Sequence, residues 1–118
     1  MFLDKLSRIS NRIPGARALC LVDGDGIPVD SVAADPQVDL DLLAAELVAR
    51  VRAISDDRAG LAVGEVEQLS VIADRLTVVV SSIGAGYYLL LVLGPEGSYG
   101  RARFELRRAR LLLRDELT

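Results

Sequence analysis

Residues 87–93, YYLLLVL, form an unbroken run of aromatic and aliphatic side chains. Successive side chains of a strand point to opposite faces of its sheet, so this run presents apolar groups on both faces. A strand of that kind is stable only where both faces are covered. The run therefore predicts a strand in the middle of a sheet that is covered on both sides.

The spacing of apolar residues and the positions of turn residues predict the remaining helices and strands. We expect helices over residues 2–13, 39–54 and from near Tyr99 almost to the end, with Asp35 or Asp39 capping the second. We expect strands over 16–22, 27–31, 65–73, 76–83 and 87–93. The mixed polar and apolar residues of 65–73 indicate an edge strand. The chain is then a single domain, 1–118, with the order α-β-β-α-β-β-β-α.

Residues 21–31, LVDGDGIPVDS, contain the densest group of acidic and glycine residues. Asp23 and Asp25 fit the start of an EF-hand calcium loop, but Ile27 occupies the next ligand position and no helix precedes the loop. A phosphate cradle would lead into a helix, whereas this loop leads into a strand. We interpret DGDG as the turn of a β-hairpin, with weak ion binding as the alternative.

The residues that catalysis usually requires are scarce. The chain has no histidine, its one lysine is far from any glycine loop, and no phosphate-binding motif is present. The single cysteine, Cys20, lies within an apolar run and is expected to be a buried structural thiol. We therefore expect no catalytic residues, no metal site and no cofactor, and hence a protein that is not an enzyme.

Charge is unevenly distributed along the chain. Residues 1–100 hold 8 basic and 14 acidic side chains, a net charge of −6, whereas residues 101–118 hold 6 arginines against 3 acidic residues, a net charge of +3. The acidic body argues against nucleic-acid binding, which requires neutralisation of phosphates. No apolar run is long enough to span a bilayer and the first residues do not form a secretory signal, so we expect a cytoplasmic protein without membrane insertion.

The helix expected over residues 39–54 carries apolar residues on two opposite faces. The broader face should rest on the sheet. The opposite face carries a stripe of apolar residues in place of charge: Leu42, Ala45, Ala49 and Ala53. Alanine is also a good former of exposed helix, but Leu42 and the scarcity of charge favour a second helix packed at close range.

A second copy of the chain is the simplest source of that helix, because most oligomers are symmetric dimers. We expect a homodimer in which the edge strand, with Leu69 and Val71, pairs with its twin and continues the sheet. The charges that flank the stripe, Glu46, Arg50 and Arg52, are candidates for contact with another protein.

The C-terminal helix should face the sheet with Ala102, Leu106, Ala109, Leu113 and Leu117. Phe104 and Leu111 lie on its opposite side among arginines. We expect the first helix to share this face of the sheet and to bury both side chains. If both are exposed instead, they indicate a docking site.

The element order, the hairpin, the middle helix and the sequence GSYGRARFELRRA together resemble the Roadblock/LC7 domain family. Within that family the chain looks like the bacterial members, typified by the gliding-motility regulator of a small Ras-like GTPase. Asp25, Gly26, Ile27 and Pro28 match the hairpin motif of the family, and Gly100 and Arg103 match the start of its last helix. The resemblance implies a profilin-like three-layer α/β (α+β) sandwich with a five-stranded antiparallel sheet, and homodimers joined through the middle helix and the third strand.

The leading functional hypothesis is a non-enzymatic homodimer that binds a small Ras-like GTPase and modulates its nucleotide cycle, with activation of GTP hydrolysis left open. Any activation would act by ordering the switch loops of the GTPase itself. The alternative is a ligand-sensing or scaffold module, in a signalling or motility complex, with no GTPase partner.

Overall fold

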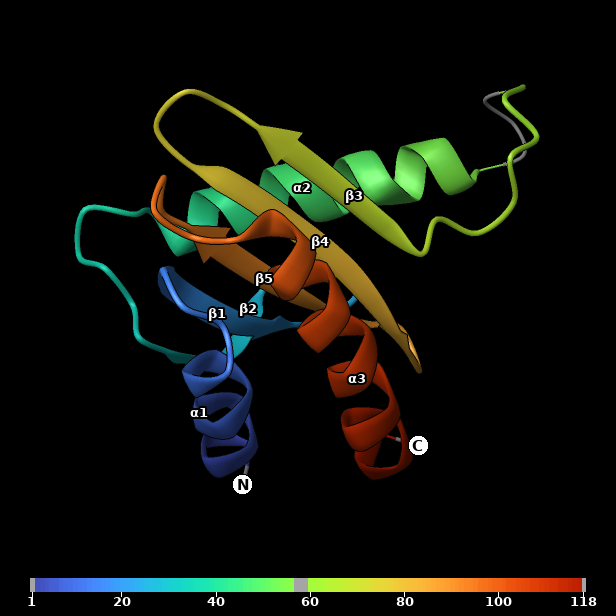
Figure 1. Ribbon diagram of the computed structural model, residues 1–118. Coiled ribbons are helices and arrows are strands. Elements are labelled where there is room, and N and C mark those ends of the chain that lie inside the picture. Colours follow the sequence, from blue (N-terminus) through green and yellow to red (C-terminus); the bar gives the residue numbers. More distant parts are fainter. Residues whose placement is uncertain (1, 57–59, 118) are drawn as a thin grey trace.

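The computed structural model describes residues 2–56 and 60–117 (Figure 1). Three helices and five strands follow one another as α1 (Leu3–Asn11), β1 (Ala16–Val22), β2 (Pro28–Val32), α2 (Leu40–Ser55), β3 (Gln68–Ile72), β4 (Thr77–Gly84), β5 (Tyr87–Leu93) and α3 (Tyr99–Leu117). The expected order of elements is confirmed. The strand expected over 65–73 is shorter than predicted. Before it begins, the Val66 amide donates to the Ser55 hydroxyl at the end of α2 (3.0 Å), and after it ends, the Ala73 amide donates to the Leu76 carbonyl in the turn to β4.

The five strands form one antiparallel sheet in the order β2-β1-β5-β4-β3. The apolar strand β5 lies in the middle, between β1 and β4, with Leu91 opposite Leu19 on one side and Val79 on the other. Strand β3 lies at one edge. Both placements confirm what the side-chain patterns predicted.

The sheet separates two apolar cores, so the molecule has three layers (Figure 1). Helices α1 and α3 cover one face and α2 covers the other. Alternate residues of β5 enter the two cores: Leu89, Leu91 and Leu93 face α1 and α3, and Leu90 and Val92 face α2. The expected sheet-facing residues of α3 are buried from Ala102 to Leu113, and Leu117 packs against the same core.

Helix α2 begins at an aspartate cap. The Asp39 carboxylate accepts a hydrogen bond from the Leu42 amide (3.0 Å), which satisfies one of the free donors of the first turn. Asp35, the other candidate, instead accepts from the Gln37 amide in the preceding loop. The helix buries Ala44, Leu47, Val48 and Val51 against the sheet.

The expectation that the first helix buries Phe104 and Leu111 is wrong. Their exposed fractions are 56% and 70%. Helix α1 lies beside the flank of α3 rather than over it: Lys5 pairs with Glu116, and Arg101 donates to the Arg12 carbonyl. The outer ridge of α3 therefore remains open to solvent.

The Cys20 side chain is fully buried beneath α2, as expected. Burial, with smaller contributions from Asp41 and Asp30, raises the pKa of its thiol to about 11. Over the described ranges 2–56 and 60–117, no helix is long and apolar enough to cross a membrane.

Candidate protein-binding surface

The outer face of α2 carries the predicted apolar stripe. Leu42 is 58% exposed, and Ala45, Ala49 and Ala53 are also exposed. Their spacing of three and four residues aligns them along one side of the helix, opposite the buried Ala44 and Val48. We call these four residues the outer stripe of α2.

Strand β3 presents side chains on the same side of the sheet as α2. Leu69 is half-buried and packs against the core beneath α2. Val71, two residues further along, points to the same face by the alternation of a strand and is 44% exposed. Among the described residues β3 pairs only with β4, so its outer backbone edge is unpaired. The outer stripe and the free edge of β3 are therefore two candidate places for association.

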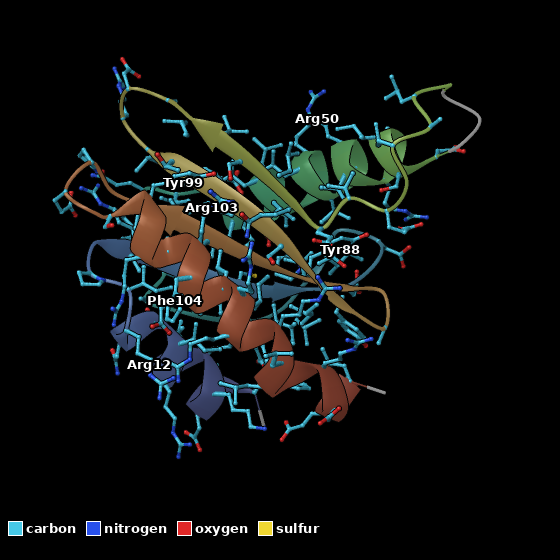
Figure 2. All side chains as sticks on the ribbon, turned by 45° about the vertical axis from the view of Figure 1, so that its right-hand side comes forward. Arg12, Arg50, Tyr88, Tyr99, Arg103 and Phe104 are labelled. Atoms are coloured by element: carbon cyan, nitrogen blue, oxygen red, sulfur yellow. The ribbon has the colours of Figure 1, made fainter. Side chains whose placement is uncertain are left out.

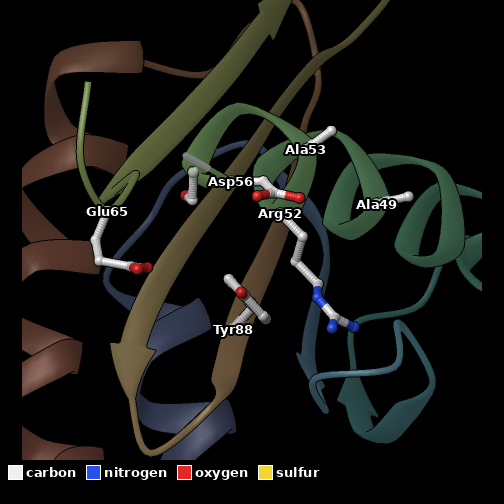
Figure 3. Close-up of a pocket in the computed structure, with 7 residues that line it drawn as sticks. Ala49, Arg52, Ala53, Asp56, Glu65 and Tyr88 are labelled. Atoms are coloured by element: carbon white, nitrogen blue, oxygen red, sulfur yellow. The ribbon is translucent and has the colours of Figure 1, made fainter. Parts of the chain in front are cut away.

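The three charged residues at the rim of the stripe differ in their surroundings. Glu46 and Arg50 form an exposed ion pair with 3.5 Å between Oε2 and Nη2. The Arg52 guanidinium instead donates to the Gly24 carbonyl at 2.7 Å. Figure 3 shows Arg52 reaching from α2 toward the hairpin between β1 and β2.

That hairpin contains the DGDG turn. The Asp23 carboxylate accepts hydrogen bonds from the amides of Asp25 (2.9 Å) and Ile27 (3.1 Å), and the Asp23 amide bonds to the Ile27 carbonyl. These bonds use the aspartate to close a turn, as the sequence predicted. In residues 2–56 and 60–117, no group of three or more His, Cys, Asp or Glu side chains could hold a metal ion.

Gly26 brings the hairpin against α2. Its φ is +81°, a conformation that residues with a Cβ rarely adopt. A Cβ at this position would lie 3.1 Å from the Ala45 Cα and 3.3 Å from the Ala44 carbonyl oxygen. The second glycine of the turn thus permits both the backbone conformation and the close approach to the helix.

A cavity of about 590 Å³ opens beside the outer stripe (Figure 3). Its walls come from α2, the residues that follow it, and β5: Ala49, Arg52, Ala53, Ser55, Asp56, Glu65 and Tyr88. The cavity combines an arginine, two carboxylates and a tyrosine with two alanines of the stripe. A polar side chain of a partner seated on the stripe would find hydrogen-bonding groups here.

Solved structures match this architecture along nearly the whole chain, although no family model and no curated protein matches it. The Roadblock/LC7 domain from Streptomyces avermitilis matches with a TM-score of 0.80 and 24% identity, over 95% of this chain and 93% of that one. The gliding protein MglB from Thermus thermophilus matches with 0.83 and 22%, over 96% and 85%. MglC from Myxococcus xanthus matches with 0.70 and 28%, over 98% of both chains. The chain has the Roadblock/LC7 fold.

Profilin IA from Acanthamoeba castellanii is a more distant match, with a TM-score of 0.62 and 12% identity over 98% of both chains. The profilin-like architecture implied by the sequence resemblance is therefore confirmed. The comparisons establish the Roadblock/LC7 fold, and the roles of the outer stripe, Leu69, Val71 and the rim charges remain predictions.

Within this Roadblock/LC7 fold, two contacts that the sequence did not reveal hold the edge strand in place. The Tyr99 hydroxyl donates to the Ser70 hydroxyl (2.7 Å), and Arg103 donates to the Gln68 side-chain oxygen (3.2 Å). Arg103 also stacks over the Tyr99 ring, 5.6 Å from its centroid (Figure 2). The start of α3 thus positions β3 from the face opposite the outer stripe.

Glu105 is the other residue whose position was missed. It is only 1% exposed, and Arg101 and Arg108 lie 3.5 and 3.6 Å from its Oε1 atom. That oxygen has no hydrogen-bond partner among the described residues. No signal in the sequence indicated this burial, because the pattern of charges along a helix does not reveal which flank is covered.

Proposed function

We propose that this protein is a non-enzymatic homodimer that binds a small Ras-like GTPase and modulates its nucleotide cycle. The single observation that carries the proposal is the outer stripe of α2 beside the unpaired edge of β3. The protein shares its fold with MglC and with MglB, which is named a gliding protein in Thermus. This likeness supports a regulatory role of the kind proposed. The sequence resemblance to bacterial regulators of Ras-like GTPases gives the class of partner.

The dimer would form through the outer stripe and β3. Small side chains let two helices approach closely, and two antiparallel copies of β3 would continue the sheet and pair its free edge. Such an interface needs roughly 1,200 Å² or more of buried surface to be stable. Leu42 of α2 and Leu69 and Val71 of β3 would supply its larger apolar groups.

The GTPase would contact the exposed surface around the paired α2 helices. Glu46 and Arg50 are both more than half exposed, and a surface ion pair of this kind contributes little stability, so both can exchange partners at small cost. Arg52 uses one nitrogen on Gly24 and has further donors for a partner. A regulator that holds the switch loops of the GTPase in order needs no catalytic group of its own.

Titration calorimetry against a small Ras-like GTPase from the same organism, loaded with GDP or with a non-hydrolysable GTP analogue, tests the proposal. We expect tighter binding of the GTP form. Arg50→Glu should weaken the complex in a salt-dependent way, and Arg75→Glu, an equal charge change on the β3–β4 turn, should not. Equal affinity for both forms would contradict regulation, because a ligand that does not distinguish two states cannot shift their populations. The absence of binding would favour the scaffold alternative.

A further inference from the structure

The layer formed by α1 and α3 differs in charge from the rest of the molecule. Residues 3–12 and 99–117 hold 9 basic and 4 acidic side chains, a net charge of +5. The remainder of the chain holds 5 basic and 13 acidic side chains, a net charge of −8. Helices α1 and α3 cover the same face of the sheet (Figure 1), so their positive charge is concentrated on one side of the molecule.

Exposed apolar side chains stand on the outside of this basic layer. Phe104 and Leu111 are seven residues apart, two helical turns, and lie opposite the buried residues Ala102, Leu106 and Ala109. Leu112 is also 52% exposed. Phe104 and Arg12 lie on the side where α1 and α3 run next to each other (Figure 2).

Arginines surround the two apolar side chains. Arg107, Arg108 and Arg114 follow Phe104 and Leu111 at spacings of three and four residues, which place them on adjoining strips of the helix. Within residues 2–56 and 60–117 neither Arg107 nor Arg114 forms an ion pair, and Arg107 shares a cavity of about 430 Å³ with Glu65 and Glu67 without pairing with either. On α1, Arg8 lines a small cavity of about 180 Å³ shared with Arg12 and Arg108.

We propose that this outer surface docks on an anionic lipid bilayer. We call it the basic face and define it by Arg8, Phe104, Arg107, Arg108, Leu111 and Arg114. A basic surface with projecting Phe and Leu side chains is the pattern of helices that lie in the membrane interface, where arginines attract anionic headgroups and apolar tips enter the acyl boundary.

The shape of the basic face favours a bilayer over an acidic protein. Its most exposed apolar groups lie on the outward ridge of a helix, and the neighbouring cavity between α1 and α3 is small. A ridge of this kind enters a deformable lipid surface directly, whereas a protein partner would need a matching groove. The net negative charge elsewhere would repel other faces of the molecule from the same lipids and orient it.

The basic face lies across the sheet from the outer stripe of α2, so it does not depend on the proposed GTPase contact. In a dimer that continues the sheet through antiparallel copies of β3, the two basic faces would lie on the same side. Both copies could then dock together, with the α2 helices directed away from the lipid.

Co-sedimentation with vesicles tests the proposal, using phosphatidylcholine alone and phosphatidylcholine mixed with phosphatidylglycerol. We expect sedimentation only with the mixed vesicles, and weaker sedimentation as salt is added. Arg107→Gln should lower the partition coefficient about fivefold, which corresponds to about 1 kcal/mol for one arginine near an anionic surface. Arg75→Gln, on the β3–β4 turn, is the matched control and should bind as the wild type does.

The apolar contribution is tested by Phe104→Ser, with Ile27→Ser as the control. Ile27 is 58% exposed, close to the value for Phe104, but lies on the hairpin away from the basic face. Phe104→Ser should reduce binding and Ile27→Ser should not, while circular dichroism shows both variants folded. Failure to bind mixed vesicles, equal binding to pure phosphatidylcholine, or equal losses in each variant and its control would overturn the proposal.

Discussion

The Arg52 guanidinium donates a 2.7 Å hydrogen bond to the Gly24 carbonyl and thereby joins helix α2 to the β1–β2 hairpin. Gly26, two residues later, packs its backbone against Ala44 and Ala45 of the same helix. A hydrogen bond and a close backbone contact therefore both join the hairpin to α2. Ala45 has its backbone against the hairpin and belongs to the outer stripe, so the packing of Gly26 supports the surface assigned to association.

Gly26→Ala should destabilise the fold more than Gly86→Ala. Both glycines have positive φ values, +81° and +79°, so both substitutions carry a backbone cost of about 1–2 kcal/mol. Only at Gly26 would the new Cβ press on α2, whereas nothing lies within 4 Å of a Cβ at Gly86. Urea denaturation should show an additional loss of about 1 kcal/mol or more for Gly26→Ala. Equal losses would mean that the hairpin moves away from the helix at no cost.

Replacement of the buried glutamate by an apolar residue should be tolerated. Glu105→Met removes a buried oxygen that lacks a hydrogen bond, and the two arginines beside it are about half exposed and can be solvated. We expect a change in unfolding free energy within about 1 kcal/mol. The double variant Arg101→Ala/Arg108→Ala should instead lose about 3 kcal/mol, because it leaves the buried carboxylate unpaired. Thermal denaturation distinguishes the two, and a more damaging Glu105→Met would show that the ion pairs stabilise α3.

The buried thiol of Cys20 should make stability fall at high pH. Burial raises its pKa to about 11 from an ordinary value of 9.0, so the folded state holds the proton more tightly than the unfolded state does. The associated stability is fully present below about pH 9 and is lost as pH rises through 11, by about 3 kcal/mol in total. The difference in unfolding free energy between wild type and Cys20→Ala should therefore be constant at neutral pH and shrink in that range. If the difference in unfolding free energy stayed constant up to pH 11, the expected effect of the Cys20 thiol would be contradicted.

Much of the fold could be predicted because apolar periodicity reports burial directly. The unbroken run of β5 indicated a central strand, and the mixed residues around Gln68 and Ser70 indicated an edge. The outer stripe of α2 was found for a related reason: an exposed helix face normally carries charge, and this one does not. Each inference needed only the pattern within a single element.

Contacts between elements distant in sequence could not be predicted in this way. Nothing in the sequence joins Arg52 to Gly24 or Tyr99 to Ser70, since each pair depends on how two elements are placed. The exposure of Phe104 was misjudged, and the burial of Glu105 was missed, for the same reason. Their environments depend on which flank of α3 lies beside α1, and residue spacing along α3 does not determine it.

Multi-angle light scattering of wild type and Ala49→Glu at micromolar concentration tests whether the protein associates through the outer stripe of α2. We expect the wild type to be a dimer, and the variant to be a folded monomer because two like charges would be buried near the symmetry axis, at a cost of about 3 kcal/mol. Ala34→Glu, at an exposed alanine of the loop before α2, is the matched control and should remain dimeric. A monomeric wild type, or an Ala49→Glu variant that stays dimeric, would contradict this assignment.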